Sequence, residues 1–594
     1  MDRYLLLFSI GPVQSFIAQA RKTQDLYGGS FLLSYLSQIV AKEIKNKGGS
    51  LIFPTKVDTS TIPTFPNLFL AEIQDKNPYL LGEQLENKIK NEWQTMAKKA
   101  INGLLEPPRG SFANNQIDTM LEIYWAFYPL NGTYNQNYDA IQRLFAARKN
   151  IRNFKPLEEI GLKCSICGER NALIYRKREN ETGDRIQRLN EQKTKILELS
   201  DTEGYSISDV SPGEQICAVC LAKRRLYKNF NKADFERNFP SVAEIASRPA
   251  IEALNKLDKD LVSNYKEIFG EYFDAELLYE ENLTEHYFQK SGIPLESLGK
   301  AKTYYKKIKE LLEASKIKLS SYYGILALDG DRMGKWLSGD FLDEANKLKE
   351  FHQKSSEKLI EFAKKARDII ENQGKGKVVY AGGDDVLAFI PLKNLFETLR
   401  MLRDEFPKFE GLGFNTREKS SVSCGVVVAH YKLPLRMVLQ QVREIEKEAK
   451  EKWQRDAFSI ALMKHSGEIK IGGAKWQYGD FKTVVKLRSI SERFKPAPDK
   501  VWFSDTFIYN LKREFQKFVD KEGLFQSFAP IFEAELKRLL IRASNGPEQE
   551  NGKKKKEIAE HYSKIISAIF NKMHLRLKDL LALLEIAVFI SKEF

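Results

Sequence analysis

The sequence predicts an α+β multidomain protein with two copies of one βααββ-type domain, a four-cysteine metal module between them, and two helical regions. An apolar strand, a glycine-containing break and helical stretches follow one another twice, first from residue 4 and again from residue 324. Two Cys-x-x-Cys pairs separate the copies. The 594-residue length is about four times the usual size of one domain, so several hydrophobic cores are expected.

The first unit covers residues 1–155. Its opening strand spans residues 4–10 and ends at a Gly11-Pro12 break. We expect helical structure from Val13 to about Arg21 and a second helix that starts near Gly29-Ser30. Short apolar runs then predict further strands at residues 50–54, 67–73 and 121–129.

The second unit, residues 319–500, repeats this order. A strand at 324–328 ends at Asp329-Gly330-Asp331, helical stretches follow to residue 372, and an apolar hairpin lies around 377–391. After a strand at 423–430 comes a helix that ends in Ala449-Lys450, as the first unit ends in Ala147-Arg148-Lys149. Two diverged copies of one domain are the simplest account of this repeat.

Two regions have helical periodicity and little strand character, residues 226–318 and residues 501–594. In the second, leucines recur at spacings that fit buried helix faces, which predicts a C-terminal bundle. Residues 545–556 (NGPEQENGKKKK) are polar and turn-rich, so an exposed loop is expected there.

The module at residues 156–225 contains Cys164 and Cys167, followed by Cys217 and Cys220. Two such pairs place four thiolates around one ion, and a closed four-thiolate zinc site is usually structural. Spacing alone does not distinguish zinc from an iron–sulfur cluster. The charged segment 169–213 is expected to project as a mobile insertion, and the lone Cys424, inside an apolar strand, is expected to be buried and inert.

The hairpin of the second unit has Gly382-Gly383-Asp384-Asp385 at its tip. Glycines permit a tight turn and a close approach of phosphates, and adjacent carboxylates require a compensating cation. Asp329 ends the preceding strand and would lie beside this tip in a ferredoxin-like sheet. The sequence therefore predicts a two-metal phosphoryl-transfer site, with a simple exposed turn as the alternative.

The formal charge of +14 favours a polyanionic partner, for which RNA is the leading candidate and a solvated basic surface the alternative. No apolar run reaches the roughly 18 residues of a membrane span, so no membrane partner is expected. Cysteines in metal-binding pairs suit a reducing compartment. We therefore expect a soluble, cytoplasmic protein.

The chain resembles the large subunit of type III CRISPR effector complexes, in the Cmr (III-B) branch. The motifs of this resemblance are the run IGPVQSFI from Ile10, the paired cysteines, the run LDGDRMGK from Leu328, and the Gly-Gly-Asp-Asp turn. The resemblance implies two ferredoxin-like palm (nucleotidyl cyclase-like) domains, a zinc module and two helical domains. It also implies that ATP binds between the palms and is converted to cyclic oligoadenylates when the complex holds target RNA on its guide RNA.

By this resemblance Asp329, Asp384 and Asp385 would hold Mg²⁺ (or Mn²⁺), and Lys450 would reach the triphosphate. The alternative for Lys450 is a solvated lysine at a helix end. The expected nucleotide-binding residues include, besides Lys450, a set of loop residues: Gly330, Asp331, Arg332, Met333, Gly334, Gly382 and Gly383.

The first unit has no acidic counterpart, because Gly11-Pro12-Val13 stands where the second unit has Asp-Gly-Asp. It is a candidate for binding the acceptor nucleotide through Gln14, Ser15 and Arg21, with core-facing helix residues as the alternative. Many family members begin with an HD-type nuclease domain. None of the six histidines here is followed by Asp, so no DNase activity is expected.

The leading hypothesis is thus an RNA-activated cyclic oligoadenylate synthase that acts with the other subunits of a type III CRISPR complex. A non-catalytic scaffold that positions guide and target RNA is one alternative. A stand-alone cyclic dinucleotide synthase is another, although two unequal palms in one chain argue against it.

Overall fold

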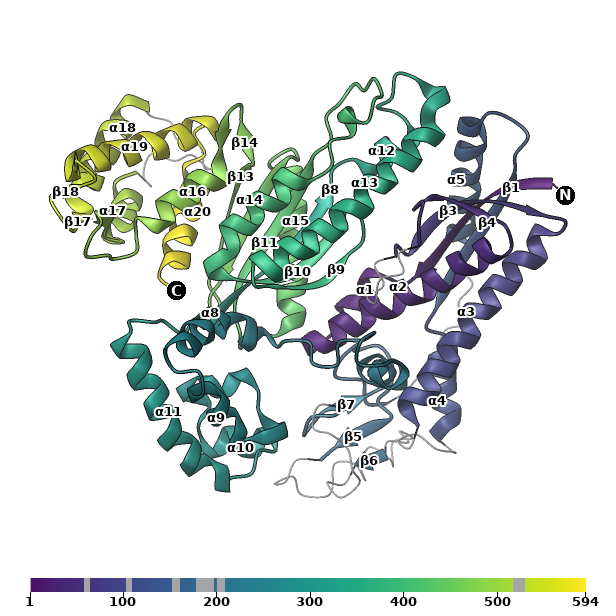
Figure 1. Ribbon diagram of the computed structural model, residues 1–594, viewed down its shortest axis with the longest axis horizontal. Helices are drawn as coiled ribbons and strands as arrows, with labels where there is room; N and C mark the ends of the chain where they lie inside the picture. The colour runs from purple at the N-terminus through teal and green to yellow at the C-terminus, as the bar shows by residue number, and fades with distance from the viewer. Residues whose placement is uncertain are drawn as a thin grey trace.

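A computed structural model describes residues 2–57, 65–102, 109–151, 161–177, 197–199, 209–515 and 529–594. The first unit and the C-terminal helices lie at opposite ends of the long axis, with the second unit between them (Figure 1). The cysteine module and the helical domain lie side by side along one edge (Figure 1). Most of the segment 169–213, expected to be a mobile insertion, lies outside the described residues.

The first unit is built on a four-stranded antiparallel sheet of order β2-β3-β1-β4. Its strands are β1 (Asp2–Gly11), β2 (Ser50–Phe53), β3 (Leu68–Asp75) and β4 (Glu122–Pro129). Its helices are α1 (Gln14–Ala18), α2 (Thr23–Asn46), α3 (Pro78–Ile101), α4 (Arg109–Asp118) and α5 (Tyr134–Asn150). The apolar runs of the sequence therefore form the expected strands.

The second helix begins earlier than expected, at Thr23 and not near Gly29. The carboxylate of Asp25 accepts hydrogen bonds from the backbone N–H groups of Arg21 and Lys22, both 3.0 Å long, and so caps the first turn. Gly28 lies inside this helix. A Cβ there would stand 2.7 Å from the Lys223 carbonyl oxygen, so the close approach of α2 to Lys223 requires glycine at this position. Gly29, near which a helix start was expected, also lies inside the helix, and a Cβ there would stand 3.1 Å from the Lys223 Cδ, so both glycines permit close packing.

The second unit has a six-stranded sheet of order β13-β12-β11-β8-β10-β9, antiparallel except between β11 and β12. The predicted strands are β8 (Tyr322–Gly330), β9 (Lys377–Ala381), β10 (Val386–Pro391) and β11 (Val422–His430). The two not predicted are β12 (Ala457–Met463) and β13 (Ile469–Lys475). The order β9-β10-β8-β11 corresponds to β2-β3-β1-β4, so both units share the arrangement of their first four strands.

Three helices of the second unit matter for its packing, namely α13 (Leu348–Asp368), α14 (Leu395–Glu405) and α15 (Leu435–Glu451). Strand β8 contributes to two cores. Leu326 and Leu328 pack with α13, α14 and the C-terminal helices. Ile325 and Ala327 belong to a core that also holds α15, the first unit and the cysteine module. Helix α15 thus lies between the two units.

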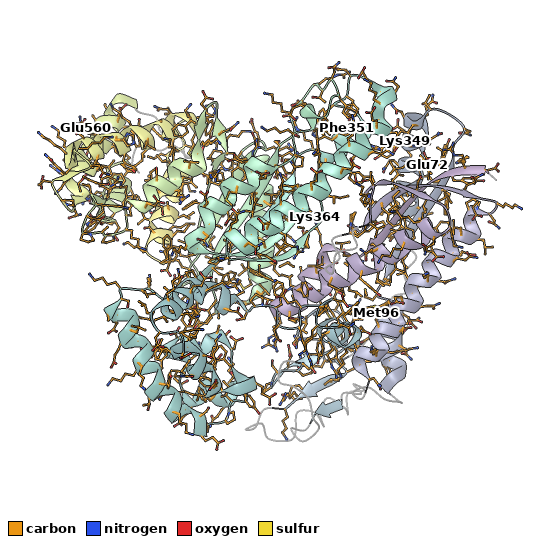
Figure 2. The ribbon with its side chains drawn as sticks, in the orientation of Figure 1. Glu72, Met96, Lys349, Phe351, Lys364 and Glu560 are labelled. Carbon is orange, nitrogen blue, oxygen red and sulfur yellow. The ribbon has the colours of Figure 1, made fainter. Side chains whose placement is uncertain are left out.

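Polar contacts also join the two units. The Lys349 ammonium on α13 lies 2.5 Å from a carboxylate oxygen of Glu72 on β3, and Figure 2 shows the two side chains together. The Tyr134 hydroxyl of α5 lies 2.8 Å from Nδ1 of His352, which is buried on α13. The units therefore meet through specific contacts.

Both remaining regions are helical, as expected. The middle region contains α8 (Val242–Leu257), α9 (Leu261–Glu267), α10 (Glu285–Ser291) and α11 (Glu296–Ala314). The C-terminal region contains α17 (Thr506–Phe515), α18 (Ala529–Ala543), α19 (Lys555–Lys572) and α20 (Leu577–Ser591). None of the described helices is long and apolar enough to cross a membrane.

The polar segment 545–556 is not a plain loop. It contains the short hairpin of β18 (Gln549–Glu550) and β19 (Lys553–Lys554). The Glu550 carboxylate accepts hydrogen bonds from the Arg493 guanidinium at 2.6 Å and from the backbone N–H of Val501 at 2.7 Å. These bonds attach the hairpin to the body, whereas Lys553 and Lys554 of β19 remain exposed.

Candidate functional site

The Gly-Gly-Asp-Asp turn joins β9 to β10 and lies against the end of β8. The Gly382 N–H donates to the Asp385 carbonyl oxygen at 2.9 Å, and Gly383 has a φ of +94°, which favours glycine. The Gly330 N–H donates to the Asp384 carbonyl oxygen at 3.1 Å. A Cβ at Gly330 would stand 2.9 Å from the Asp384 Cβ. The structure thus brings the two acidic elements together, as the sequence predicts.

The carboxylates of this turn are half-buried and mutually repulsive. Burial and the nearby Asp329 charge raise the pKa of Asp384 to about 7. Burial, Asp329 and Asp384 together raise the pKa of Asp385 well above its usual range. The Tyr380 hydroxyl lies 2.9 and 2.8 Å from the two Asp385 carboxylate oxygens and donates to them. One tyrosine therefore fixes the orientation of Asp385.

Lys450, at the end of α15, occupies the acidic site. Its ammonium pairs with the Asp329 carboxylate and lies 2.6 Å from a carboxylate oxygen of Glu446. Burial opposes the charge, but Asp329 and Glu446 outweigh it and raise the pKa of Lys450. The side chain is only 23% exposed, so the alternative of a solvated lysine is wrong. With Asp329 paired to Lys450, the three carboxylates do not converge on one point.

Asp331 has different surroundings from Asp329. It is 3% exposed, and its carboxylate accepts from the Ser421 and Ser423 hydroxyls at 2.7 Å each and from the Asp456 N–H at 2.9 Å. Three protein donors therefore occupy the carboxylate that the resemblance assigns to the nucleotide site. This arrangement favours a structural role, in which Asp331 ties β8 to β11 and to the start of β12.

The rest of the glycine loop leaves its main chain accessible. Arg332 adopts a φ of +56° before the short helix α12 (Met333–Ser338), and its guanidinium lies 3.2 Å from Glu418 at the surface. A Cβ at Gly334 or Gly382 would meet no atom within 4 Å. Nothing in the described chain thus blocks a ligand from approaching the backbone at these glycines.

The predicted acceptor residues of the first unit are exposed. Gln14 and Ser15 are exposed on α1, and the Arg21 side chain is 55% exposed. The alternative that they face the core is therefore wrong. Arg443 on α15 donates to the Gln14 carbonyl oxygen at 3.0 Å, a contact the sequence analysis missed. The sequence feature that could have predicted this role of Arg443 is its spacing, because Arg443, Glu446 and Lys450 share one face of a helix.

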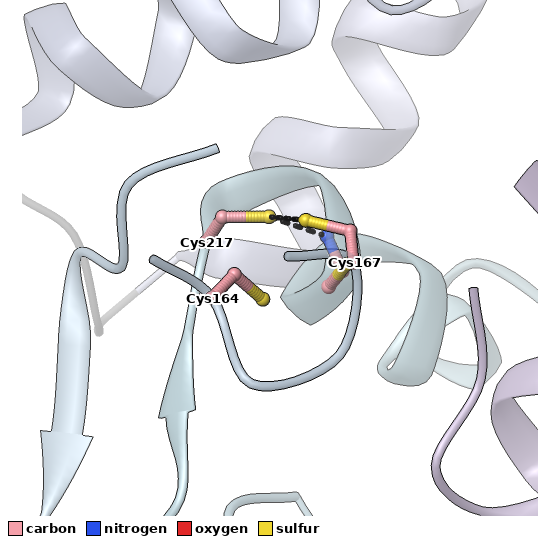
Figure 3. Close-up of side chains that lie close together, drawn as sticks. Cys164, Cys167 and Cys217 are labelled. Atoms are coloured by element: carbon pink, nitrogen blue, oxygen red, sulfur yellow. Dashed lines mark hydrogen bonds between the residues drawn. The ribbon is translucent and has the colours of Figure 1, made fainter. Parts of the chain in front are cut away.

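The four paired cysteines are buried, and their sulfur atoms all lie within 4.8 Å of one another. Figure 3 shows the Cys167 and Cys217 sulfurs facing each other, 3.9 Å apart, with Cys164 beside them. Backbone N–H groups of Ile166 and Cys220 donate to the sulfurs of Cys164 and Cys217, at 3.4 Å each. Four converging sulfurs suit a tetrahedral zinc ion.

Among the described residues, this is the only group of three or more metal-type ligands with all donor atoms within 4.8 Å. Asp329, Asp384 and Asp385 do not form such a group in this structure. Cys424 lies fully buried on β11, as expected.

Helix α7 (Ala218–Arg224) starts at the second cysteine pair and connects it to the first unit. The buried Lys223 ammonium donates to the Phe16 carbonyl oxygen at 2.9 Å. The buried Arg224 guanidinium donates to Asp25 at 2.7 and 2.9 Å, and to Glu214 at 2.6 and 3.0 Å. The sequence analysis missed these contacts, for which the only signal is a Lys-Arg pair one turn after Cys220.

Comparisons with known proteins agree with this architecture. Residues 322–459 match the family model "Cas10/Cmr2, second palm domain", and residues 5–98 match "CRISPR-associated protein Cmr2, N-terminal". The CRISPR system Cmr subunit Cmr2 of Pyrococcus furiosus is 25% identical, over 86% of this chain and 67% of that protein.

Two solved structures share the fold. One is a chain of the type III-B Cmr-β complex in its apo state, with a TM-score of 0.64 and 16% identity over 93% of this chain and 78% of that chain. The other is a chain of Cmr-β bound to cognate target RNA, with a TM-score of 0.61 and 15% identity over 96% and 83%. In sequence motifs, family models and fold, the chain resembles the Cmr2-type large subunit of type III CRISPR effector complexes.

Proposed function

We propose that the chain is the nucleotidyltransferase subunit of a type III CRISPR effector complex, and that it converts ATP to cyclic oligoadenylates in response to target RNA. One observation carries this proposal. Within the segment that matches the second palm domain, Asp384 and Asp385 lie at the end of β8 that bears Asp329. A group of carboxylates beside a lysine is the donor set for metal-assisted phosphoryl transfer.

The residues present fit a divalent cation. Burial and mutual repulsion raise the pKa values of Asp384 and Asp385, and a bound cation would relieve that repulsion. Asp329, Asp384 and Asp385 would hold Mg²⁺ or Mn²⁺. When bound, such ions lower the pKa of an attacking ribose hydroxyl and neutralise charge on a triphosphate.

The side chains around the carboxylates have separate tasks in this proposal. Tyr380 holds Asp385 in one orientation through its hydroxyl. Lys450 neutralises Asp329 before ATP binds and is available to the triphosphate once Asp329 has another partner. The main chain at Gly334 and Gly382 has room for phosphates, and Arg332, Met333, Gly330 and Gly383 shape the adjoining loops.

We propose that the first unit is a degenerate palm. It has the same order of its first four strands as the second unit, but Gly11-Pro12-Val13 replaces the acidic motif. The exposed Gln14, Ser15 and Arg21 are then available to an acceptor nucleotide. The proposed domains are residues 1–155 and 319–500 for the palms, 156–225 for a structural zinc module, and 226–318 and 501–594 for the helical domains.

The fold shared with chains of the Cmr-β complex supports assembly with other subunits. One of those structures contains cognate target RNA, and the net charge of +14 suits a polyanionic partner. We therefore include guide RNA and target RNA among the partners. The proposal includes no DNase activity.

The test is to incubate the assembled complex with ATP, Mg²⁺ and complementary RNA and to identify products by mass spectrometry. The wild-type complex should yield cyclic oligoadenylates only with target RNA. The double variant Asp384→Ala/Asp385→Ala should yield none, while it retains complex assembly and bound zinc.

Two results would contradict the proposal. Normal synthesis by the double variant would show that Asp384 and Asp385 are not the catalytic carboxylates. A wild-type complex that binds target RNA but forms no nucleotide product would favour the scaffold role.

A further inference from the structure

Strand β4 forms an open edge of the first sheet. It is the terminal strand in the order β2-β3-β1-β4, and within the described residues no strand pairs with its outer side. Proteins usually protect such edges with short strands, lysines, prolines or bulges. The eight residues of β4, EIYWAFYP, have a charge only at the start and a proline only at the end. Its central part is aromatic and unprotected.

The backbone groups that face outward can be identified from the register. Arg3 and Leu130 form a hydrogen-bonded pair, because the Leu130 N–H donates to the Arg3 carbonyl oxygen at 2.9 Å. Hydrogen-bonded and non-bonded pairs alternate along an antiparallel ladder. The pairs Phe127–Leu6 and Trp125–Phe8 are therefore non-bonded toward β1. The N–H and C=O groups of Trp125 and Phe127 consequently point to the open side.

A cleft of about 670 Å³ lies over this edge. Three consecutive strand residues, Trp125, Ala126 and Phe127, line it, which places the cleft over the edge and not over one face of the strand. The α3 side of the lining includes Tyr79, Glu83 and Glu86, and the α5 side includes Leu144 and Arg148. Figure 1 shows β4, α3 and α5 in the same N-terminal unit.

The walls of the cleft are preformed and partly apolar. The Trp125 indole N–H donates to Glu86 at 2.9 Å, and its ring packs so closely on α3 that a Cβ at Gly82 would stand 2.6 Å from it. Tyr79 is 63% exposed and Leu144 is 45% exposed. Exposed aromatic and aliphatic groups beside unpaired strand backbone are typical of protein-docking grooves.

We propose that this groove binds an extended segment of a partner protein, which adds to the sheet as a strand beside β4. Alternate side chains of an added strand face opposite sides. One set would meet the carboxylates Glu83 and Glu86 on α3, and the other would meet Leu144 on α5. The segment that fits therefore alternates basic and apolar residues.

The test uses the 594-residue chain and a fluorescent eight-residue peptide of alternating valine and lysine, with fluorescence anisotropy as the readout. A valine–glutamate peptide of the same length should bind at least about 10-fold more weakly, because several like-charge contacts replace attractive ones. Leu144→Arg should abolish binding of the valine–lysine peptide. The matched control Ile531→Arg, at a 58% exposed position on α18, should leave binding unchanged.

Backbone methylation tests the strand pairing itself. Methylating two alternate amides that face β4 removes two hydrogen bonds and should weaken binding about 30-fold, at about 1 kcal/mol for each bond. Methylating two amides of the other set should have little effect. In hydrogen exchange, bound peptide should slow the Trp125 and Phe127 amides, while the Ala126 amide, bonded to β1, is already slow.

Several results would overturn the proposal. These are no binding of the valine–lysine peptide, equal effects of both methylated sets, or an unchanged affinity for Leu144→Arg. A dimer of the chain in light scattering that Leu144→Arg dissociates would assign the groove to a second copy and would also overturn it.

Discussion

Replacing Arg224 with methionine should destabilise the joint between the cysteine module and the first unit. Arg224, Asp25 and Glu214 are at most 2% exposed, and the guanidinium makes four hydrogen bonds of 2.6–3.0 Å to the two carboxylates. Methionine fills much of the same space but leaves both carboxylates buried and facing each other. Breaking a buried ion pair from one side costs about 3–5 kcal/mol.

The assay is hydrogen exchange of the α7 amides in the full chain, which reports opening of this joint and does not require the whole protein to unfold in one step. A loss of about 3–5 kcal/mol accelerates exchange roughly 10²- to 5 × 10³-fold. The exposed pair of Arg417 and Asp343 provides the matched control, with side chains 65% and 48% exposed. Arg417→Met should change stability by less than about 1 kcal/mol.

The ion pairs of Arg224 with Asp25 and Glu214 predict a pH dependence of stability. Burial alone would raise the pKa of Asp25, but Arg224 outweighs it and holds the pKa well below the usual range; Glu214 is affected in the same way. The ion pairs therefore stabilise the folded chain above pH about 4, and that stabilisation is lost as the pH falls further. In Arg224→Met the unpaired carboxylates protonate more readily, so the difference from wild type should shrink on acidification.

A triple neutral variant separates charge from packing. Asp25→Asn/Glu214→Gln/Arg224→Met removes the buried charges together and should recover at least half of the loss, because neutral replacement of a buried ion pair is often tolerated. Exchange from α7 at the wild-type rate in Arg224→Met would refute the reasoning. So would a triple variant as unstable as the single one.

Four further outcomes are expected. Tyr380→Phe should raise the Mg²⁺ concentration for half-maximal nucleotide synthesis about 10-fold, because Asp385 loses the hydroxyl that orients it. The control Tyr323→Phe should not change this concentration, because the Tyr323 hydroxyl has no hydrogen-bond partner among the described residues. Lys450→Met should raise the KM for ATP and leave folding intact in thermal unfolding; an unchanged KM would remove Lys450 from the site. Dialysis against a chelator should release zinc, measured by a metal-sensitive dye, and accelerate exchange in α7; no effect on α7 would argue against zinc in the cysteine cluster. Burial lowers the pKa of His352 to about 4, so the neutral ring is favoured in the folded chain, and thermal stability should fall between pH about 6.5 and 4 in wild type but less in His352→Gln.

The strands of the two units could be predicted because their apolar runs are short, rich in β-branched and aromatic residues, and bounded by glycine or proline. Strands β12 and β13 were missed because their positions are defined by distant partners. Strand β12 pairs in parallel with β11, and β13, with its paired glycines Gly472 and Gly473, packs against α20. The apolar run of β12 (AFSIALM) fits a buried helix segment as well as a strand, and the glycines weaken the strand signal of β13.

The acidic residues could be predicted because two carboxylates in a glycine turn have few structural uses. The network around them could not. Tyr380 reads as an ordinary aromatic residue in a strand, and only the register of the hairpin places its hydroxyl on Asp385. Asp331 differs from Asp329 by two positions in one motif, yet Ser421 and Ser423, just before and within β11, bind one carboxylate and leave the other to Lys450.

A continuous set of contacts connects the cysteine cluster to the acidic site. Lys223 of α7 binds the Phe16 carbonyl of α1, Gln14 of α1 accepts from Arg443 of α15, and the same helix carries Lys450 to Asp329. Contact alone does not establish coupling, which requires that both ends shift one equilibrium. A double-mutant cycle between Lys223→Met and Arg443→Met measures that coupling in the KM for ATP. An interaction energy above about 0.5 kcal/mol would show that the cysteine module helps to position α15, the helix that carries Lys450. Additive effects would show that the cysteine module supports the first unit without influencing α15.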